Sequence, residues 1–495
     1  MIYPEYEEFE SWAGDYKIGG VLKEISGDTE TPITLFKKFE DFTNSFLLES
    51  VEGGERRGRY TYMGRNPFME IKAYGDRVLV KTKEKTIKRE GEPLGILKEI
   101  LHNYNSPYTG RMPDFTGGAV GYIAYDVAEN YMGIFKKKED EVGNPDLHFI
   151  LSKELIVYDH VKQRIILIVN SLLEGNIKEV YKGAIERLRA MENEIKRKVY
   201  RGQKLEKQGG LPLNYKANET RASFIEKVNR AKEYIVKGEV NQLVLSQRLE
   251  VDTDLDAFQV YRQLRGVNPS PYLFYINFGD YQIVGSSPEI MVKVKNKKVF
   301  SCPIAGTRPR GRNLAEDEKL KEELLADKKE VAEHLMLVDL AREDLRKICK
   351  EGKIQLEDYM EVHKYSHVMH IVTNLVGDLK DGHDMFDATM ACMPAGTLSG
   401  TPKVRAMELI GELENSRRGF YGGAVGYFAF NGNMDTCIAI RSILFKGNKA
   451  YLQGGAGIVA DSIAEKEYYE VQKKFEALIE TLERSGGNRK FREVL

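Results

Sequence analysis

Short alternations of apolar and polar residues characterise the first third of the chain. The stretches VLVKTKEKTIKRE, from Val78, and ELIVYDHVKQRIILIVN, from Glu154, each contain two alternating runs around a polar turn. A period of two places apolar side chains on one face of a strand, and a short polar break between two such runs is typical of a hairpin. The pattern over about 78–169 therefore predicts antiparallel sheet.

Later segments change to helical spacing. Apolar residues recur at steps of three and four between 177 and 199, which predicts a helix. Ser223 and Glu226 resemble a capping box and predict a second helix, which we expect to end at Gly238. The same reasoning predicts further helices over about 315–345, 368–375, 402–413 and 464–482.

The segment RGQKLEKQGGLPLNYKANE is polar, contains Gly and Pro and has no periodicity, so we interpret 201–219 as a linker. We expect an N-terminal region over 1–200 and a C-terminal domain over 220–495. Strands grouped with strands and helices with helices favour the α+β class, with large, mostly antiparallel sheets flanked by helices. This grouping disfavours a Rossmann fold.

The string GGAVGY occurs twice, at 117–122 and at 422–427. Both copies fit a strand that another backbone approaches closely, because glycine has no side chain. Their flanking residues differ. We interpret the first copy as a structural strand and the second as part of a functional site, and we explain the shared letters without duplication of a whole domain.

Composition narrows the classes of function. Lys and Arg number 74 and Asp and Glu 75, so there is no general electrostatic attraction to nucleic acid or to an anionic membrane, and we expect a small ligand. The four cysteines are scattered without a C-x-x-C pair, which predicts neither a disulfide nor a zinc site. With no signal-like N-terminus and no membrane-length apolar run, we expect a cytoplasmic protein.

Two of the predicted helices each present a pair of carboxylates. Glu330 and Glu333 share one face of the first, and Glu467 and Glu470 share one face of the second, with Lys474 one turn further on. Carboxylates from two helices, completed by water and an anionic substrate, could hold Mg²⁺. The alternative is the ordinary solvated face of a helix.

Three segments could bind an anion. The small and hydroxyl residues around Thr397 precede a helix with Pro402 in its first turn, where backbone N–H groups attract anions. The string QGGAGIVADS predicts a glycine turn rich in backbone donors. For both segments the alternative is a plain loop or turn. Arg441 interrupts an apolar strand, and we interpret it as a buried carboxylate clamp rather than an edge residue that reaches solvent.

Two residues are candidates for proton transfer. His370, which we place on a helix with His367, is either a base or a hydrogen-bonded structural residue. Glu289 follows a proline at the start of a strand. It is either an exposed acid or a positioned general acid, and the second role requires a raised pKa.

Together these strings resemble one family, the chorismate-utilising enzymes, and within it the anthranilate synthase large subunits. The resemblance runs from LLESVEGGERRGRYTYMG at Leu47 to the terminal helix. The matching strings follow the family's order: NPSPYLFY, GSSPE, PIAGTRPRG, EHLMLVDLAR, YSHVMH, AGTLSGTPKVRAMELI, YGGAVGYF, DTCIAIRS and GGAGIVADS. The resemblance implies that family's fold, with an N-terminal regulatory region.

The resemblance also implies a reaction and its residues. The reaction is the Mg²⁺-dependent amination of chorismate at C2, with loss of the C4 hydroxyl and elimination of pyruvate, the first step of tryptophan biosynthesis. The implied metal ligands are Glu333 and Glu470, supported by Glu330 and Glu467. Glu289 would protonate the departing hydroxyl. The other implied site residues are His370, assisting loss of the C2 proton, and Gly306, Thr307, Thr397, Tyr421, Arg441, Gly455, Ala456, Gly457 and Lys474 around the substrate.

Two positions distinguish members of the family. Aminodeoxychorismate synthases typically carry lysine where this chain has Ala305, and isochorismate synthases carry lysine where it has Gln242. Without either lysine, the implied nucleophile is ammonia, supplied by a separate glutamine amidotransferase subunit. The enzymatic alternative is an aminodeoxychorismate synthase component I. The alternative from another class is a non-catalytic protein that senses tryptophan.

A second ligand is implied at the junction of the two regions. Ser50 and the segment Pro271, Tyr272 and Leu273 match the family's feedback pocket for L-tryptophan. Without the resemblance these residues would be a strand end and a turn.

Overall fold

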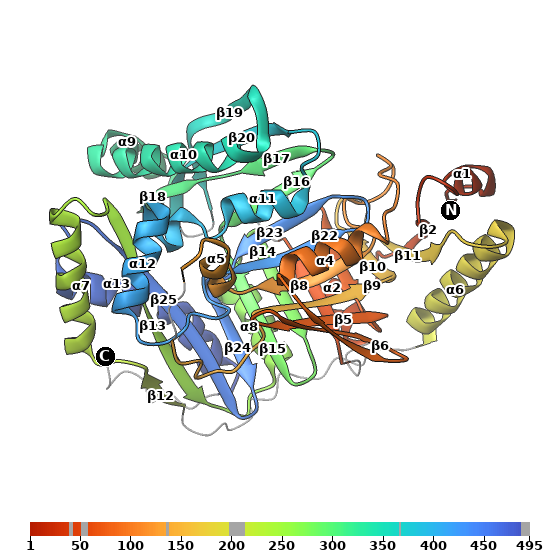
Figure 1. Ribbon diagram of the computed structural model, residues 1–495, viewed down its shortest axis with the longest axis horizontal. Coiled ribbons are helices and arrows are strands. Elements are labelled where there is room, and N and C mark those ends of the chain that lie inside the picture. Colours follow the sequence, from red (N-terminus) through yellow and green to blue (C-terminus); the bar gives the residue numbers. More distant parts are fainter. Residues whose placement is uncertain (39–42, 51–57, 135–137, 198–212, 366–367, 487–495) are drawn as a thin grey trace.

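The computed structural model describes residues 1–38, 43–50, 58–134, 138–197, 213–365 and 368–486 (Figure 1). Two large antiparallel sheets, with helices packed around them, form the molecule, so the predicted α+β class is confirmed. Most of the expected linker, 201–219, lies outside the described residues, and β12 (Asn214–Ala217) occupies the part that is described.

The first sheet has thirteen strands in the described ranges. In spatial order they are β1 (Ile2–Tyr3), β2 (Ile18–Ser26), β11 (Arg164–Leu172), β10 (Glu154–Asp159), β4 (Tyr60–Gly64), β3 (Ser45–Glu49), β14 (Tyr272–Asn277), β15 (Tyr281–Ser287), β24 (Ser442–Lys446), β25 (Lys449–Ile458), β13 (Gln242–Asp252) and β12, with β21 (Gly400–Thr401) beside β13.

The second sheet has twelve strands in the same ranges. Their order is β18 (Ile304–Pro309), β20 (Val368–Leu379), β17 (Lys298–Ser301), β16 (Ile290–Lys295), β23 (Met434–Ile438), β22 (Ala424–Ala429), β8 (Gly118–Ile123), β9 (Leu147–Ser152), β5 (Met69–Tyr74), β6 (Arg77–Thr82) and β7 (Thr86–Glu90), with β19 (Cys349–Lys364) beside β20. The predicted hairpins are therefore β6 with β7 and β10 with β11.

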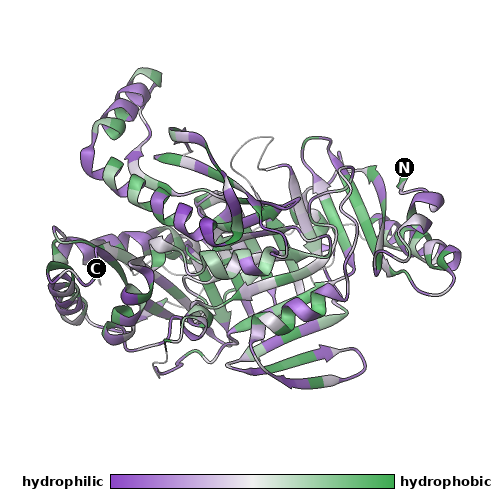
Figure 2. Ribbon diagram, turned by 45° about the horizontal axis from the view of Figure 1, so that its top comes forward, coloured by the Kyte–Doolittle hydropathy of each residue, from purple (hydrophilic) through white to green (hydrophobic). Residues whose placement is uncertain are grey.

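Helices cover the outer faces of the sheets. They are α1 (Tyr6–Ser11), α2 (Pro32–Lys37), α4 (Pro93–His102), α5 (Tyr125–Tyr131), α6 (Ile177–Arg197), α7 (Arg221–Val236), α8 (Ala257–Val267), α9 (Leu314–Ala326), α10 (Lys328–Ile348), α11 (Met385–Cys392), α12 (Lys403–Leu413) and α13 (Ala464–Arg484), with the 3₁₀ turn η1 (Gly396–Leu398). Figure 2 shows hydrophobic residues concentrated on the central strands, and mixed hydropathy on the outer helices. No helix in the described ranges has the length and apolarity needed to cross a membrane.

In each sheet the strands on the two sides of the centre follow a similar order. Outward from the centre of the first sheet the order is β3, β4, β10, β11, β2 on one side and β14, β15, β24, β25, β13 on the other. On each side the last of these strands comes first in the chain, so the two halves have the same topology. The two halves of the chain thus form both sheets together, since each supplies strands to both.

The two copies of GGAVGY lie next to each other at the centre of the second sheet. They form β8 and β22, which pair antiparallel with Gly121 opposite Gly426. The shared strand order of the two halves and the pairing of the two copies favour duplication over our expectation that the shared letters arise without it. Close approach of another backbone restricts these positions to glycine, whereas most other positions of a strand accept many apolar residues.

Two neighbouring strands of the C-terminal half pass from one sheet to the other at the same place. β15 ends at Ser287 and the chain continues as β16 in the second sheet, while β23 leaves the second sheet and continues as β24 in the first. Because β15 pairs with β24 and β16 pairs with β23, the two crossings are adjacent. The N–H of Ile438 donates to the carbonyl of Glu289 at 3.0 Å, and the N–H of Ser286 donates to that of Arg441 at 3.0 Å.

Most predicted helices are confirmed. The predictions over 177–199, 402–413 and 464–482 correspond to α6, α12 and α13, and Gly238, with φ of 78°, follows the end of α7 as predicted. The start of α7 differs, because Thr220, not Ser223, is the N-cap and its side chain accepts from the N–H of Ser223.

Two helix predictions need correction. The run over 315–345 is two helices, since Asp327 ends α9 and its side chain caps α10. The segment 368–375 is not a helix, because it forms the start of β20. Its β-branched residues Val368, Ile371, Val372 and Thr373 favour a strand.

Gly121 should be a sensitive position of this sheet. A Cβ built there would lie 1.9 Å from the carbonyl oxygen of His148, a backbone atom of the paired strand. We expect G121A to lower the free energy of unfolding by about 2 kcal/mol or more, measured by urea denaturation. The matched control is G183A on α6, where a Cβ meets nothing within 4 Å; it should be neutral or stabilising by up to about 1 kcal/mol. Equal stability of the two variants would contradict the close approach of β8 and β9.

Candidate functional site

The adjacent sheet crossings present two charged side chains. Glu289 directly precedes β16, and Arg441 directly precedes β24. Around them lie α10, which packs on β18, and α13, which packs on β25, while η1 contacts both β25 and α10. These elements bring the candidate residues of the C-terminal half into one region.

Glu289 meets the requirement for a general acid. The hydroxyl of Thr397, on η1, donates to Oε1 of Glu289 at 2.9 Å. Burial raises the pKa of Glu289 to about 7, although the Thr397 hydrogen bond and the charge of Lys474 act in the opposite direction. The carboxyl group is therefore substantially protonated near neutral pH and can donate a proton there.

His370 lies in β20 and not on the predicted helix; His367 is outside the described residues. Its Nδ1 lies 2.7 Å from the carbonyl oxygen of Gly306 and 3.2 Å from Oγ1 of Thr307. Donation from Nδ1–H to Gly306 leaves Nε2 as the unprotonated nitrogen of the neutral ring. A ring fixed in this way can accept a proton at Nε2.

Gly306 connects this histidine with the carboxylates of α10. Its φ is 69°, and a Cβ there would lie 3.3 Å from Oε2 of Glu330. Glu330 also lies 3.4 Å from Nη1 of Arg308. The Gly306 turn, His370 and Glu330 thus form one corner of the site.

The candidate carboxylates lie on two helices, and Glu470 of α13 is near enough to influence Glu333 of α10. Burial and the negative charges of Glu330 and Glu470 raise the pKa of Glu333. Burial and the charge of Glu470 also raise the pKa of Glu467. Lys474 lies 2.9 Å from Oε1 of Glu470. Repulsion between carboxylates of α10 and α13 is the situation that a divalent cation relieves, so the donor set fits Mg²⁺.

Oxygen is the only donor that this set offers. Within the described ranges, no three or more His, Cys, Asp or Glu side chains are already grouped to hold a metal ion. The ligands beyond Glu333 and Glu470 would then be water and substrate, which is the usual pattern for Mg²⁺.

The glycines of QGGAGIVADS lie in a strand, which corrects the predicted turn. Gly455, Ala456 and Gly457 belong to β25 and pair with Ser246, Leu245 and Val244 of β13. The pairing of β25 with β24 ends at Leu452 and Ile443, so beyond that point the second edge of β25 faces no strand of the described sheet. Lys474 donates to the carbonyl of Gly455 at 2.6 Å.

Glycine is required at this edge by close contacts. A Cβ on Gly455 would lie 2.8 Å from the carbonyl oxygen of Leu245 and 3.0 Å from the hydroxyl of Tyr421. Burial raises the pKa of Tyr421, so its hydroxyl stays protonated and can donate. The strand edge and the Tyr421 hydroxyl therefore offer hydrogen-bond groups to a ligand.

Arg441 lies between two strands and not within one. Its backbone is in the left-handed region, with φ of 51°. Burial lowers its pKa, while Tyr421 and Glu470 act in the opposite direction. In the described part of the chain no carboxylate forms an ion pair with this guanidinium, which suits the binding of an anionic ligand.

Pro402 is the N-cap of α12 and not part of its first turn. We predicted that the segment around Thr397 binds an anion at the start of a helix. In the structure the Thr397 hydroxyl instead donates to Glu289. The predicted catalytic, substrate and metal residues nevertheless form one connected cluster, in which each touches or electrostatically influences the next.

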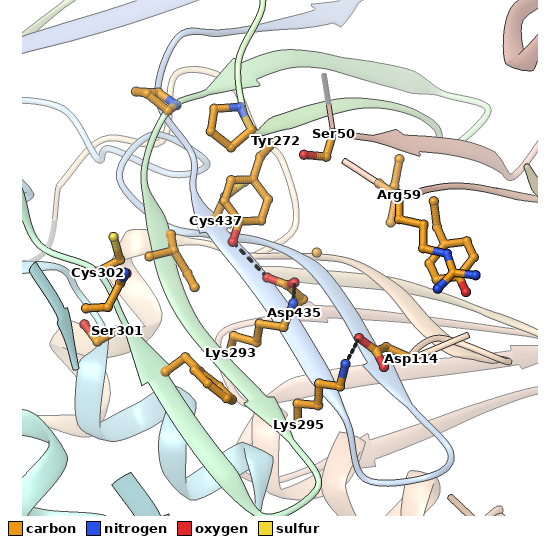
Figure 3. A pocket seen from close by; sticks show the side chains of 18 of the residues that line it. Ser50, Arg59, Asp114, Tyr272, Lys293, Lys295, Ser301, Cys302, Asp435 and Cys437 are labelled. Carbon is orange, nitrogen blue, oxygen red and sulfur yellow. Dashed lines mark hydrogen bonds and ion pairs between the residues drawn. The ribbon is translucent and has the colours of Figure 1, made fainter. Parts of the chain in front are cut away.

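The four predicted tryptophan residues lie elsewhere, in a cavity of about 1410 Å³. Ser50, at the end of β3, and Pro271 with Tyr272 and Leu273, at the start of β14, line it (Figure 3). The Tyr272 hydroxyl donates to Asp435 at 3.0 Å. Pro288, the neighbour of Glu289, also lines this cavity, so the two sites are close but separate.

Sequence reasoning missed Glu49 in the same cavity. Its Oε2 accepts from the hydroxyl of Tyr261 and from Nε of Arg265. Its Oε1 is buried, and Thr61 lies near enough to the carboxyl group to influence it. Burial raises the pKa of Glu49, and Arg265 acts in the opposite direction. Only the position of Glu49 next to Ser50 in LLES could have pointed to it.

Known proteins share this sequence and fold. The sequence model of the family described as chorismate binding enzyme matches residues 43–480. Anthranilate synthase component 1 of Acetivibrio thermocellus is 47% identical, over 98% of this chain and 99% of that protein. The protein of the same name from Aquifex aeolicus is 40% identical, over 96% and 97%.

Solved structures agree. The crystal structure of anthranilate synthase component I from Streptococcus pneumoniae superposes with a TM-score of 0.74 at 36% identity, over 92% of this chain and 98% of that one. The menaquinone-specific isochorismate synthase MenF of Escherichia coli shares the fold, with a TM-score of 0.69 at 18% identity, over 96% and 98%.

The raised pKa of Glu289 makes stability depend on pH in a stated direction. The pKa of this carboxyl rises to about 7 on folding, so the folded state holds the proton more tightly than the unfolded state. The free energy of unfolding therefore falls as pH rises from the unfolded pKa to about 7. Relative to E289Q, the wild type should lose about 3 kcal/mol between pH 4 and pH 8, measured by urea denaturation. The control is E186Q on the exposed face of α6. A wild-type curve parallel to that of E289Q would contradict the raised pKa.

Proposed function

The chain belongs to the family of chorismate binding enzymes, and from this we propose that it is an anthranilate synthase large subunit that converts chorismate to anthranilate. The observation that carries the proposal is Glu289, a carboxyl whose burial raises its pKa to about 7 at the centre of the cluster. A proton donor of this kind is what the loss of a ring hydroxyl requires.

The substrate's charges suit the groups around Glu289. Chorismate carries a ring carboxylate and a second carboxylate on its enolpyruvyl ether. Arg441, the open edge of β25 and the Tyr421 hydroxyl bind the enolpyruvyl carboxylate, and the Gly306 and Thr307 turn lies beside the ring. A guanidinium and fixed hydrogen-bond groups in a partly buried site bind such a carboxylate strongly.

Glu289 donates its proton to the C4 hydroxyl while ammonia forms a bond to C2, so the hydroxyl leaves as water. The carboxylate that remains keeps the hydrogen bond from Thr397, and the charge of Lys474 stabilises it. His370 then accepts the C2 proton at Nε2 as the C3–O ether bond breaks, and the enolpyruvate that leaves takes up a proton from solvent to become pyruvate. The hydrogen bond of His370 to Gly306 holds the imidazole ring in the orientation needed.

Glu333 and Glu470 would hold Mg²⁺, with Glu330 and Glu467 in support. When bound, the ion neutralises the ring carboxylate and the charges of the two helices. Burial and the negative charges of Glu330 and Glu470 raise the pKa of Glu333, which supports this assignment.

The nucleophile is ammonia from a glutamine amidotransferase subunit. Ala305 on β18 and Gln242 on β13 offer no amine in place of it. The enzymatic alternative, an aminodeoxychorismate synthase, would keep the enolpyruvyl group. We place the protein in the cytoplasm, since all four thiols are buried and none is in a disulfide.

L-tryptophan binds in the cavity at β3 and β14 and inhibits the enzyme. Glu49 suits the ammonium group of an amino acid, because it is a carboxyl that lines the cavity and Tyr261 and Arg265 both donate to its Oε2. Tyr60, Tyr62 and Tyr272 offer aromatic surface. Since β3 belongs to one half of the chain and β14 to the other, a ligand there can change how the halves pack and so affect the crossings.

Turnover of chorismate tests the proposed reaction. With Mg²⁺ and an ammonium salt, the purified chain should produce anthranilate, seen by fluorescence, and pyruvate in equal amounts. E470A should reduce turnover at least about 1,000-fold while leaving the unfolding curve and tryptophan binding intact. Amine product without pyruvate would identify an aminodeoxychorismate synthase. Tryptophan binding without any turnover would identify a sensor protein.

Glu49 should determine inhibition without affecting chemistry. E49Q removes a charge-assisted hydrogen bond to the ligand's ammonium, so the tryptophan concentration for half inhibition should rise at least about tenfold with kcat unchanged. Calorimetry should show the same loss of affinity. The control is E99Q, an exposed residue that pairs with Arg89. Unchanged inhibition of E49Q would place the ammonium elsewhere.

A further inference from the structure

A buried ion pair lies behind the site and takes no part in the steps above. Arg418 is 3% exposed and Glu414 7% exposed. The two side chains form a forked pair, with Nε of Arg418 2.8 Å from Oε2 of Glu414 and Nη2 2.7 Å from Oε1. Burial of such a pair has a large desolvation cost, and apolar residues of similar size often give equal stability. Its geometry therefore needs an explanation besides stability.

The remaining donors of Arg418 reach two other segments. Nη1 donates to the carbonyl of Leu398 at 2.6 Å, and Nη2 donates to that of Val244 at 2.8 Å. Glu414 also accepts from the N–H and hydroxyl of Ser246, at 2.8 and 3.0 Å. One ion pair thus joins η1, β13 and the end of α12.

Both η1 and β13 lie next to the residues proposed to react with or bind the substrate. Leu398 directly follows Thr397, whose hydroxyl donates to Glu289. Val244 and Ser246 pair with Gly457 and Gly455 on the open strand edge. The Arg418 guanidinium therefore connects η1, which holds Glu289 through Thr397, with β13, which pairs with the open edge of β25.

The N-terminal half fixes the guanidinium from the other side. Its carbon lies 4.6 Å from the centre of the Tyr125 ring. The N–H of Tyr125 donates to the carbonyl of Gly419, and the N–H of Gly419 donates to Asp126 at 2.7 Å. Arg418 is therefore held between the halves, where its five donors have little freedom.

We propose that Arg418 is a positioning residue, which holds η1 and β13 so that Thr397 donates to Glu289 and the Gly455 edge faces Arg441. This role rests on the proposed function. No other basic residue could replace it, because a lysine ammonium cannot reach Glu414, Leu398 and Val244 in the planar geometry of a guanidinium.

The role has a consequence for pH dependence. The Thr397 hydrogen bond lowers the pKa of Glu289, so its loss raises that pKa. Glu289 acts only when protonated, and activity therefore falls as pH rises through its pKa. A variant in which η1 is held less firmly should have the alkaline limb of its kcat–pH profile at higher pH. Its kcat should also fall, because Glu289 is less well positioned.

The test compares two neighbouring arginines. R418K should lower kcat about 100-fold, change the KM for chorismate less, and raise the alkaline limb relative to wild type at the same ammonium concentrations. R417K is the matched control, because Arg417 pairs with Asp146 and Asp126 and is not bonded to η1 or β13 in the described structure. Its profile should match the wild type. An R418K profile equal to that of R417K would overturn the proposal.

Two further variants complete the test. T397V should raise the same limb, and T397V/R418K should raise it no further, because Arg418 acts through the Thr397 segment; additive shifts would overturn that route. E414Q, which keeps the shape of the pair, replaces R418K if that variant does not fold.

If the wild type makes no product, the proposed function fails. The positioning role can then still be tested by stability. The difference in unfolding free energy between R418K and R418K/E289Q, measured against pH, gives the Glu289 pKa in the R418K background. This pKa should be higher than the one obtained in the same way in the R417K background.

Discussion

The structure depends on one constraint, the passage of two paired strands from one sheet to the other at the same place. Backbone hydrogen bonds from Ile438 to Glu289 and from Ser286 to Arg441 join the two crossings. Regular sheet pairing stops there, so the side chains at the crossings can interact with η1 and α13, as Glu289 does with Thr397 and Arg441 with Glu470. The two backbone hydrogen bonds bring together the segments of Glu289 and Arg441, although the two residues are 152 positions apart in the chain (441 minus 289).

The same crossing occurs in the N-terminal half with different side chains. Phe68, after Pro67, directly precedes β5 as Glu289, after Pro288, precedes β16, and Lys153 directly precedes β10 as Arg441 precedes β24. The Lys153 ammonium lies 4.5 Å from the centre of the Phe68 ring, so an aromatic contact takes the place of a proton donor. The C-terminal half also has α9, α10, η1 and α12 between its strands. The chemistry therefore belongs to side chains and insertions, and the repeated sheets supply the scaffold.

Much of the fold could be predicted from the sequence, because strong alternation gave β6, β7, β10 and β11, and apolar spacing gave α6, α12 and α13. Prediction failed where one pattern permits two structures. VMHIVTNLV fits a short helix or a strand, and the glycines of QGGAGIVADS fit a turn or a close strand edge. The shared strand order of the two halves is visible in the sequence as the repeated string GGAVGY. The pKa of Glu289 and the buried oxygen of Glu49 depend on neighbours from distant segments, which no local pattern contains.

Burial keeps the carboxyl group of Glu289 substantially protonated near neutral pH, so that it can act as an acid. Infrared difference spectroscopy, wild type minus E289Q, measures this group directly as pH is raised from 5 to 9. The wild type should show a protonated carboxyl band that is absent from E289Q and is half lost at about pH 7. A carboxylate signal that is already complete at pH 5 would contradict it.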